Sequence, residues 1–346
     1  MTQAQNYIVP PGSKVLVTGA NGYIASHIIK ALLDLGYLVR GTVRTPMPWL
    51  TEYFETQCGP GRFELRVVSD FQQSDAFDES VKGVSGVIHV AQGLPSSTAA
   101  ETVETATAYT VNGVVNLLQA ASTEPTIKRV VLTSSIVAAG YPTGKGFKLD
   151  VDSWDRSLEQ ASKDGTTVPI YRACKIEGER QAWKWVEKNQ PHFELNSVLP
   201  WLTELTNHEI ISKLGKILHP NIGGSTMGYV SGLLKGDTTP FKFLPLPWFV
   251  DVEDTARLHA IALISPSVRS ERLFAAATPF IWGDVVEILK RIQPNNARIP
   301  AAPVQEEPTL GDVVPAARAE KLLRETFGQR GWTPLEVSLE GGIARE

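Results

Sequence analysis

The sequence predicts an α/β fold, a doubly wound parallel sheet joined to a smaller, discontinuous C-terminal lobe. In the N-terminal part of the chain, short apolar runs rich in β-branched residues alternate with helical patterns. This alternation is typical of a parallel sheet whose two faces are covered by helices. After Pro200 the alternation fades into sequence rich in turn residues, which predicts the second lobe.

Six apolar segments of strand length predict the sheet, and the segments between them include long helical patterns. The predicted strands are Lys14–Thr18, Leu38–Val43, Phe63–Ser69, Gly86–Ala91, Arg129–Thr133 and Phe193–Leu199. The predicted helices are Ala25–Leu35, Thr102–Ser122 and Tyr171–Lys188.

The second half of the chain carries fewer regular signals. Residues 249–264 predict a strand end and a helix that return to the core, and the Pro- and Glu-rich residues 299–308 predict a surface connection. The C-terminal stretch predicts one amphipathic helix, Val314–Phe327, and a short tail. We therefore predict a dinucleotide-binding domain of residues 1–199 plus about 240–275, and a substrate-binding lobe of about 200–239 plus 276–346.

The composition argues against several functional classes. Charged residues make up 20% of the chain, the net charge is −4 and no long basic run occurs, so neither nucleic acid nor a membrane surface is a predicted partner. No apolar run spans a bilayer, and Met1–Gly12 lacks the pattern of a secretory leader. Cys58 and Cys174 form neither a disulfide framework nor a metal-binding pattern. We expect a soluble cytoplasmic protein without a metal, either a monomer or a homodimer.

A glycine-containing turn follows the first predicted strand and opens the first predicted helix. In Gly19-x-x-Gly22-x-x-Ala25, the first glycine permits a tight turn and the second lets phosphates approach the backbone. The small Ala25 allows the helix to lie close to the sheet, and the N–H groups at the helix start are available to a pyrophosphate. An ordinary strand-to-helix turn is the alternative, but the strand–turn–helix context favours a dinucleotide site.

The end of the second strand indicates which nicotinamide cofactor is used. NAD sites usually carry an acid there, whereas Val39–Pro46 contains two arginines and no acid. Because a guanidinium pairs well with a 2′-phosphate, we predict NADPH, with Arg44 as the main phosphate ligand and Arg40 either as a support or as an arginine without a part in binding. Two solvated surface arginines are the alternative. Asp70 is placed to meet the adenine amino group or to cap a turn.

Tyr171 and Lys175 lie one helical turn apart on the same helix face. Carbonyl reduction needs a hydride, which a nicotinamide supplies, and a proton, which the protein supplies. A tyrosine has a pKa near 10, and a nearby ammonium lowers it, so we predict Tyr171 as the proton donor and Lys175 as its activator and a ligand of the nicotinamide ribose. Ser135, after the fifth strand, is predicted to hold the substrate oxygen. Strand-end capping is the alternative for Ser135 and for Ser134.

Together these segments resemble the extended branch of the short-chain dehydrogenase/reductase superfamily. Within it they are similar to fungal and yeast NADPH-dependent aldehyde and ketone reductases and to plant dihydroflavonol reductases. The likeness covers roughly residues 8–280 and rests on Val17–His27, Val39–Arg44, Val87–Ala91, Leu132–Ser135, Tyr171–Lys175, Pro191–Pro200 and Phe249–Asp254 with His259. The resemblance implies a Rossmann fold, a catalytic triad of Ser135, Tyr171 and Lys175, and transfer from the B face of the nicotinamide.

The motifs and the resemblance together predict a cofactor site. Its residues are Thr18, Gly19, Asn21, Gly22, Tyr23, Ile24, Arg44, Asp70, Phe71, Ala91, Tyr171, Lys175 and Pro200. The segment Trp201–Asn207 departs from the relatives, which carry a short turn that contacts the nicotinamide amide. Trp201 is therefore either part of an aromatic pocket or a core residue, and Glu204 either a second acid or a solvated helix start. The cluster Phe241–Phe249 lines the substrate entrance or packs between the lobes.

We therefore predict reduction of a ketone or an aldehyde, a small hydrophobic or aromatic molecule, to an alcohol by NADPH. A nucleotide-sugar epimerase or dehydratase using NAD is one alternative, but it favours an acid where Arg44 stands, and the dehydratases carry an acidic pair after the residue that corresponds to Ser135. A non-catalytic NADP-sensing regulator is another, but such proteins tend to lose the tyrosine or the lysine. His89 is expected to be a satisfied core residue.

Overall fold

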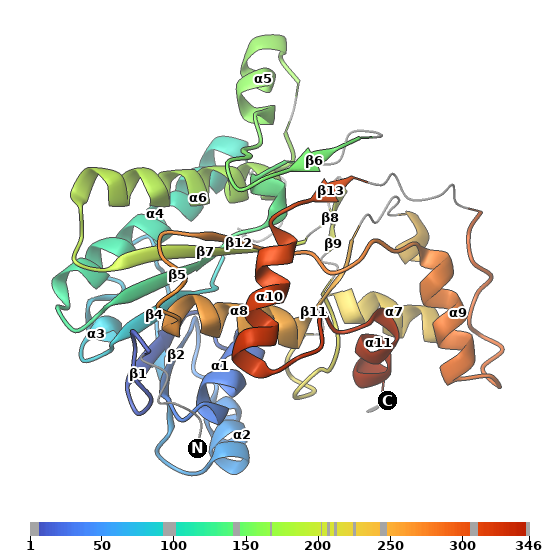
Figure 1. Cartoon of the computed structure of the whole chain (residues 1–346), viewed down its shortest axis with the longest axis horizontal. Helices are drawn as coiled ribbons and strands as arrows, with labels where there is room; N and C mark the ends of the chain where they lie inside the picture. The colour runs from blue at the N-terminus through green and yellow to red at the C-terminus, as the bar shows by residue number, and fades with distance from the viewer. Residues whose placement is uncertain are drawn as a thin grey trace.

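A seven-stranded parallel sheet forms the centre of the molecule in the computed structural model (Figure 1). The structure describes residues 7–92, 102–140, 146–166, 168–201, 203–205, 208–210, 213–223, 226–242, 248–304 and 311–343. The strand order is β12-β7-β5-β4-β1-β2-β3. The strands are β1 (Lys14–Val17), β2 (Leu38–Val43), β3 (Phe63–Val67), β4 (Gly86–His89), β5 (Arg129–Thr133), β7 (Glu194–Pro200) and β12 (Arg272–Ala275). The order reverses between β1 and β4, which opens a crevice at their carboxyl ends.

Helices cover both faces of the sheet, and successive residues of β1 show why. Val15 and Val17 belong to the core beneath one helical layer, whereas Leu16 belongs to the core beneath the other. A strand buried on both faces needs apolar residues at every position. The first layer contains α1 (Tyr23–Asp34), α8 (Val252–Ile264) and α10 (Ala316–Phe327), and the second contains α4 (Val103–Thr123) and α6 (Ile170–Asn189).

The second lobe has a hydrophobic core of its own, on the right in Figure 1. It is built from α7 (Thr226–Leu234), α9 (Trp282–Ile292), α11 (Leu335–Ile343) and the parallel pair of β10 (Lys213–Leu214) and β11 (Val250–Asp251). The domain division predicted from the sequence stays a prediction, but α10, which it placed in this lobe, packs with the core of the sheet through Ala319, Leu322 and Leu323.

Shorter elements complete the described chain. They are α2 (Pro48–Cys58), α3 (Asp78–Val81), α5 (Ser157–Asp164), the 3₁₀ turns η1 (Ile136–Ala138) and η2 (Thr239–Lys242), the parallel pair of β6 (Lys148–Leu149) and β13 (Asp312–Val313), and the antiparallel pair of β8 (Thr203–Leu205) and β9 (His208–Ile210). Among the described residues, no helix combines the length and the apolar character needed to cross a membrane.

The doubly wound sheet predicted from the sequence is confirmed, and β2 and β5 have the predicted bounds. Three details were wrong. The strand β12 was missed, because a four-residue run that begins with Arg272 carries no strand pattern. The C-terminal tail contains a second helix, α11, whose Leu339 and Ile343 pack into the lobe core. Glu204 lies in the hairpin of β8 and β9 and not at a helix start.

Candidate active site

The turn after β1 has the close packing that a dinucleotide turn requires. Gly19 has a φ of 69°, a conformation that side chains disfavour, and a Cβ here would lie 3.1 Å from the Cα of Ala91. A Cβ at Gly22 would lie 3.1 Å from the carbonyl oxygen of Gly19. A side chain at either position would therefore force its neighbours to shift, and at Gly19 the positive φ disfavours one as well.

The start of α1 presents backbone donors at the same turn. The first helical hydrogen bond runs from the N–H of Ser26 to the carbonyl of Gly22 at 2.9 Å. The N–H groups of residues 23–25 precede it and have no carbonyl within the helix to bond. The hydroxyl of Tyr23 points elsewhere, donating to the carbonyl of Gly215 at 2.8 Å. Among the predicted cofactor contacts of this turn, Tyr23 therefore offers a cofactor its backbone N–H and not its hydroxyl. Asn21 and Ile24 are half-buried.

Thr18 and His89 form a buried link between β1 and β4. The oxygen Oγ1 of Thr18 accepts the N–H groups of Val90 and Ala91, both at 3.0 Å, so its own proton is donated to Nδ1 of His89 at 2.9 Å. Burial, and then the charge of Lys175, lower the pKa of His89 to about 3. His89 is therefore a neutral, satisfied core residue, as the sequence predicted.

The two arginines of the β2 segment have different environments. Arg40 is buried, and its guanidinium donates to Glu64 Oε1 at 2.7 Å and to the carbonyls of Ser80 and Lys82, both at 2.8 Å. These contacts make Arg40 structural, and the support to the cofactor considered for it is wrong. Arg44 directly follows the strand and is exposed, available to a charged ligand.

A second group of residues lies beside Arg44. Asp70 and Phe71 follow the end of β3, and Tyr109 of α4 lies close to Asp70 and Arg44. Burial raises the pKa of Tyr109, and the charges of Asp70 and Arg44 shift that pKa in opposite directions, so both charges lie close to the phenol. Phe71 is buried and packs edge-on against Tyr109, with ring centroids 4.8 Å apart. Asp70 Oδ1 accepts the N–H of Gln72 at 3.0 Å, so Asp70 does cap a turn. Its predicted contact with adenine stays a prediction.

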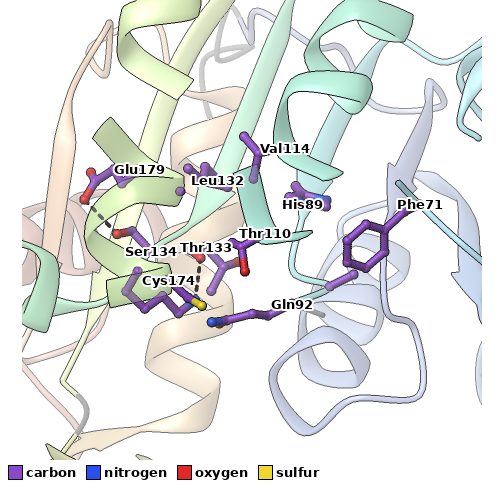
Figure 2. Close-up of a pocket in the computed structure, with 13 residues that line it drawn as sticks. Phe71, His89, Gln92, Thr110, Val114, Leu132, Thr133, Ser134, Cys174 and Glu179 are labelled. Carbon is purple, nitrogen blue, oxygen red and sulfur yellow. Dashed lines mark hydrogen bonds between the residues drawn. The ribbon is translucent and has the colours of Figure 1, made fainter. Parts of the chain in front are cut away.

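The two serines after β5 differ in direction. Ser134 donates to Glu179 Oε2 at 2.7 Å, which commits it to the protein interior (Figure 2). The Oγ atom of Ser135 lies 3.4 Å from the carbonyl of Pro200 and accepts the N–H of Val137 at 3.3 Å. Ser135 therefore caps η1 in this structure, and its hydroxyl proton has only a long, weak contact.

The N-terminal turns of α6 place Tyr171 and Lys175 together. The ammonium of Lys175 lies 5.8 Å from the centroid of the Tyr171 ring and donates to the carbonyl of Thr133 at 3.0 Å. Thr133 is held in turn, because its hydroxyl donates to Nε2 of His259 at 2.8 Å while Nδ1 of His259 donates to the carbonyl of Thr255 at 2.8 Å. His259 thus supports the strand end that holds Lys175.

A pocket lies beside these groups, between the ends of β4 and β5 and the helices α4 and α6 (Figure 2). Its wall includes Lys175, Thr133, Gln92, Thr110 and Glu179. The last three were not predicted from the sequence, because single polar residues form no motif. For Glu179 a weak signal existed, since it follows Lys175 by four residues and therefore shares its helix face.

The described residues Trp201, Phe241 and Phe249, whose role the sequence left open, are packed against other side chains. Trp201 is fully buried, with its ring centroid 4.9 Å from that of Trp248, which agrees with a core residue. Phe249 belongs to the core of the second lobe, the half-buried Phe241 packs against that core, and residues 243–247 lie outside the described residues. Cys174 is buried within α6.

Comparison with known proteins identifies the family. Residues 15–197 match the NAD dependent epimerase/dehydratase family. Ketoreductase adrE of Penicillium rubens is 91% identical over 346 residues, which cover 100% of both chains. Aldehyde reductase 2 of Sporidiobolus salmonicolor is 34% identical, over 100% of this chain and 99% of that protein. The structure of yeast methylglyoxal/isovaleraldehyde reductase Gre2 complexed with NADPH has a TM-score of 0.76 and 25% identity, covering 95% of this chain and 96% of that one. The chain therefore belongs to the NAD dependent epimerase/dehydratase family, in the extended branch of the short-chain dehydrogenase/reductase superfamily.

Proposed function

We propose that this protein is an NADPH-dependent carbonyl reductase that converts a ketone or an aldehyde of a small molecule into an alcohol. The observation that carries the proposal is the placement of Tyr171 and Lys175 on one face of α6, with Lys175 bonded to the end of the strand that leads to Ser135. A ketoreductase at 91% identity and an aldehyde reductase at 34% identity support this reaction class.

The residues of the turn fit a dinucleotide. Gly19 leaves the space that a Cβ would fill against Ala91, and residues 23–25 direct N–H groups at the same place. We assign the 2′-phosphate to Arg44, the adenine to Asp70 and Phe71, and the nicotinamide side to Tyr171, Lys175 and Pro200. The remaining predicted contacts are Thr18, Gly19, Asn21, Gly22, Tyr23, Ile24 and Ala91.

When bound, NADPH supplies a hydride to the carbonyl carbon of the substrate. The Ser135 hydroxyl donates a hydrogen bond to the carbonyl oxygen and holds it beside Tyr171. The phenol of Tyr171 then gives its proton to that oxygen, which completes the alcohol and leaves a phenolate. The ammonium of Lys175, held by the carbonyl of Thr133, stabilises this phenolate.

The burial of these groups strengthens their electrostatic effects. Ser135 is 1% exposed, Tyr171 7% and Lys175 8%. Charges and hydrogen bonds act more strongly where water is excluded, so a preorganised hydroxyl and ammonium stabilise the developing negative charge on the substrate oxygen.

The test of the reaction class is oxidation of NADPH and of NADH with a panel of aryl ketones, aliphatic ketoesters and aldehydes. We expect carbonyl-dependent oxidation of NADPH and weak oxidation of NADH, with preference for hydrophobic or aromatic carbonyls. Copurified, tightly bound NAD would favour the epimerase or dehydratase alternative. Binding of NADP without turnover of any carbonyl would favour the regulator.

The test of the proton donor is Tyr171→Phe. This variant should bind NADPH normally and lose turnover by about 100-fold or more, the usual contribution of a positioned acid. The matched control is Tyr53→Phe, which removes a phenol from α2 and should leave turnover unchanged. Normal turnover by the Tyr171→Phe enzyme would contradict the assignment.

A further inference from the structure

A third residue of α6, Glu179, lies on the helix face that carries the two predicted catalytic residues. Tyr171, Lys175 and Glu179 are spaced by four residues, so their side chains follow one another along the helix. The side chain of Glu179 is fully buried. The groups that bind this carboxylate therefore also influence the positions of Tyr171 and Lys175 on the same helix.

The carboxylate of Glu179 is bonded to three neighbouring strands. It accepts hydrogen bonds from Ser134, directly after β5, at 2.7 Å and from Ser197 of β7 at 2.6 Å. Arg272 of β12 donates to it twice, from Nε at 2.9 Å and from Nη2 at 3.1 Å. Both carboxylate oxygens are engaged, so α6 is tied to β5, β7 and β12 at one point.

Arg272 is held equally firmly on its other side. Its Nη1 donates to the carbonyls of Ser153 at 2.7 Å and Val151 at 3.2 Å. The guanidinium also lies over the ring of Trp154, 3.9 Å from its centroid. A bidentate pair between a planar guanidinium and a carboxylate is directional as well as strong, so it sets the orientation of the groups it joins.

The charge state of the pair is well defined. Burial raises the pKa of Glu179, but the positive charge of Arg272 and the hydrogen bonds from Arg272, Ser197 and Ser134 outweigh burial and hold that pKa below its usual value. The carboxylate is therefore ionised, and the pair is a buried ion pair with satisfied partners.

We propose that Glu179 and Arg272 are positioning residues for catalysis. The pair holds α6 against the end of β5, so that Tyr171 and Lys175 meet the hydroxyl of Ser135 with the geometry that the reaction needs. The bond from Ser134 to Glu179 fixes the residue next to Ser135, so one carboxylate locates both parts of the site. This inference rests on the proposed function, because it assigns a role within the same reaction.

The test compares two variants that separate stability from positioning. Glu179→Gln keeps the shape of the side chain but leaves Arg272 without its counter-charge, so it should lower the melting temperature as well as turnover. The apolar double variant Glu179→Leu with Arg272→Met removes both charges, and replacing a buried pair in this way commonly restores stability. We expect the double variant to recover part of the melting temperature, since the carbonyls of Val151 and Ser153 and the hydroxyls of Ser134 and Ser197 lose a partner, but not the turnover.

Three readouts distinguish positioning from a merely structural role. For the folded double variant we expect kcat to fall by about 10- to 100-fold, the usual effect of small misplacements of reacting groups. The isotope effect with NADPH deuterated at the transferred position should rise, because the chemical step becomes slower than product release. The dissociation constant of NADPH should also rise, since Lys175 is displaced. The control is Glu177→Gln on the same helix, whose partners are Arg180 and Gln181 and which should change none of these.

The outcomes separate this proposal from the proposed function. If the wild-type protein reduces carbonyls and the folded double variant keeps its kcat and isotope effect, the positioning role is overturned while the function stands. If the wild-type protein reduces no carbonyl, the proposed function fails, and the dissociation constant of NADPH decides the inference. If the dissociation constant of NADPH is then unchanged in the folded double variant, the positioning role is overturned. If the double variant does not fold, the same measurement on Glu179→Gln decides.

Discussion

Replacing Arg44 with serine removes the guanidinium at the exposed end of β2 and leaves the strand intact. The side chain follows the last residue of β2 and is exposed, so its loss should change the stability of the fold little. If Arg44 binds the 2′-phosphate, the variant loses hydrogen bonds between charged groups, worth about 1.5–3 kcal/mol. That loss corresponds to an increase of about 10- to 100-fold in the KM for NADPH.

Arg40→Met is the matched control, since Arg40 lies on the same strand but is buried. Its loss leaves the buried carbonyls of Ser80 and Lys82 without this donor, whereas the carboxylate of Glu64 keeps Lys14 as a donor. We expect a destabilisation of about 2–4 kcal/mol from unpaired buried acceptors, visible as a lower melting temperature. The preference for NADPH over NADH should stay unchanged in this variant.

The assay measures kcat/KM for NADPH and for NADH with one carbonyl substrate, at two salt concentrations. For Arg44→Ser we expect the NADPH value to fall, the NADH value to stay, and the salt dependence of the NADPH value to weaken, because exposed charges are screened by salt. An unchanged ratio of the two values in Arg44→Ser, or a changed ratio in Arg40→Met, would refute the division of roles.

Two further predictions concern the glycine turn and a buried acid. Gly19→Ala should lower the free energy of unfolding by about 2–3 kcal/mol, because of the positive φ of Gly19 and its contact with Ala91, and should weaken NADPH binding. The control Gly12→Ala has a positive φ but open space around the added methyl group, so it should lower stability less and leave NADPH binding unchanged. Equal losses of stability in the two variants, measured by denaturant titration, would contradict this prediction. Burial, and then the charge of Asp254, raise the pKa of Asp251 to about 6. The folded state therefore binds this proton more tightly, and the protein loses about 3 kcal/mol of stability as the pH rises from well below 4 to well above 6. Asp251→Asn should remove this pH-dependent loss of stability. If the difference in unfolding free energy between the variant and the wild type is the same at every pH, the raised pKa of Asp251 is contradicted.

The sequence by itself determined the features that depend on neighbouring residues. The turn from Gly19 to Gly22 was recognisable because a positive φ and a close approach to Ala91 both demand glycine. The pairing of Tyr171 with Lys175 was predictable because a helix brings residues four apart onto one face. The parallel sheet was predictable because its predicted strands are apolar runs, whose side chains pack alternately into the cores on the two faces of the sheet.

Tertiary structure decided which polar residues are exposed to a ligand and which are hydrogen-bonded inside the protein. Arg40 and Arg44 look alike in the sequence, but long-range contacts with Glu64, Ser80 and Lys82 commit the first to the interior. Likewise, β12 was invisible because Arg272 argues against a buried strand. Its charge is tolerated there only because Glu179, 93 residues away in the chain, neutralises it. A buried charge depends on its partner in space, and spacing along the chain does not reveal that partner.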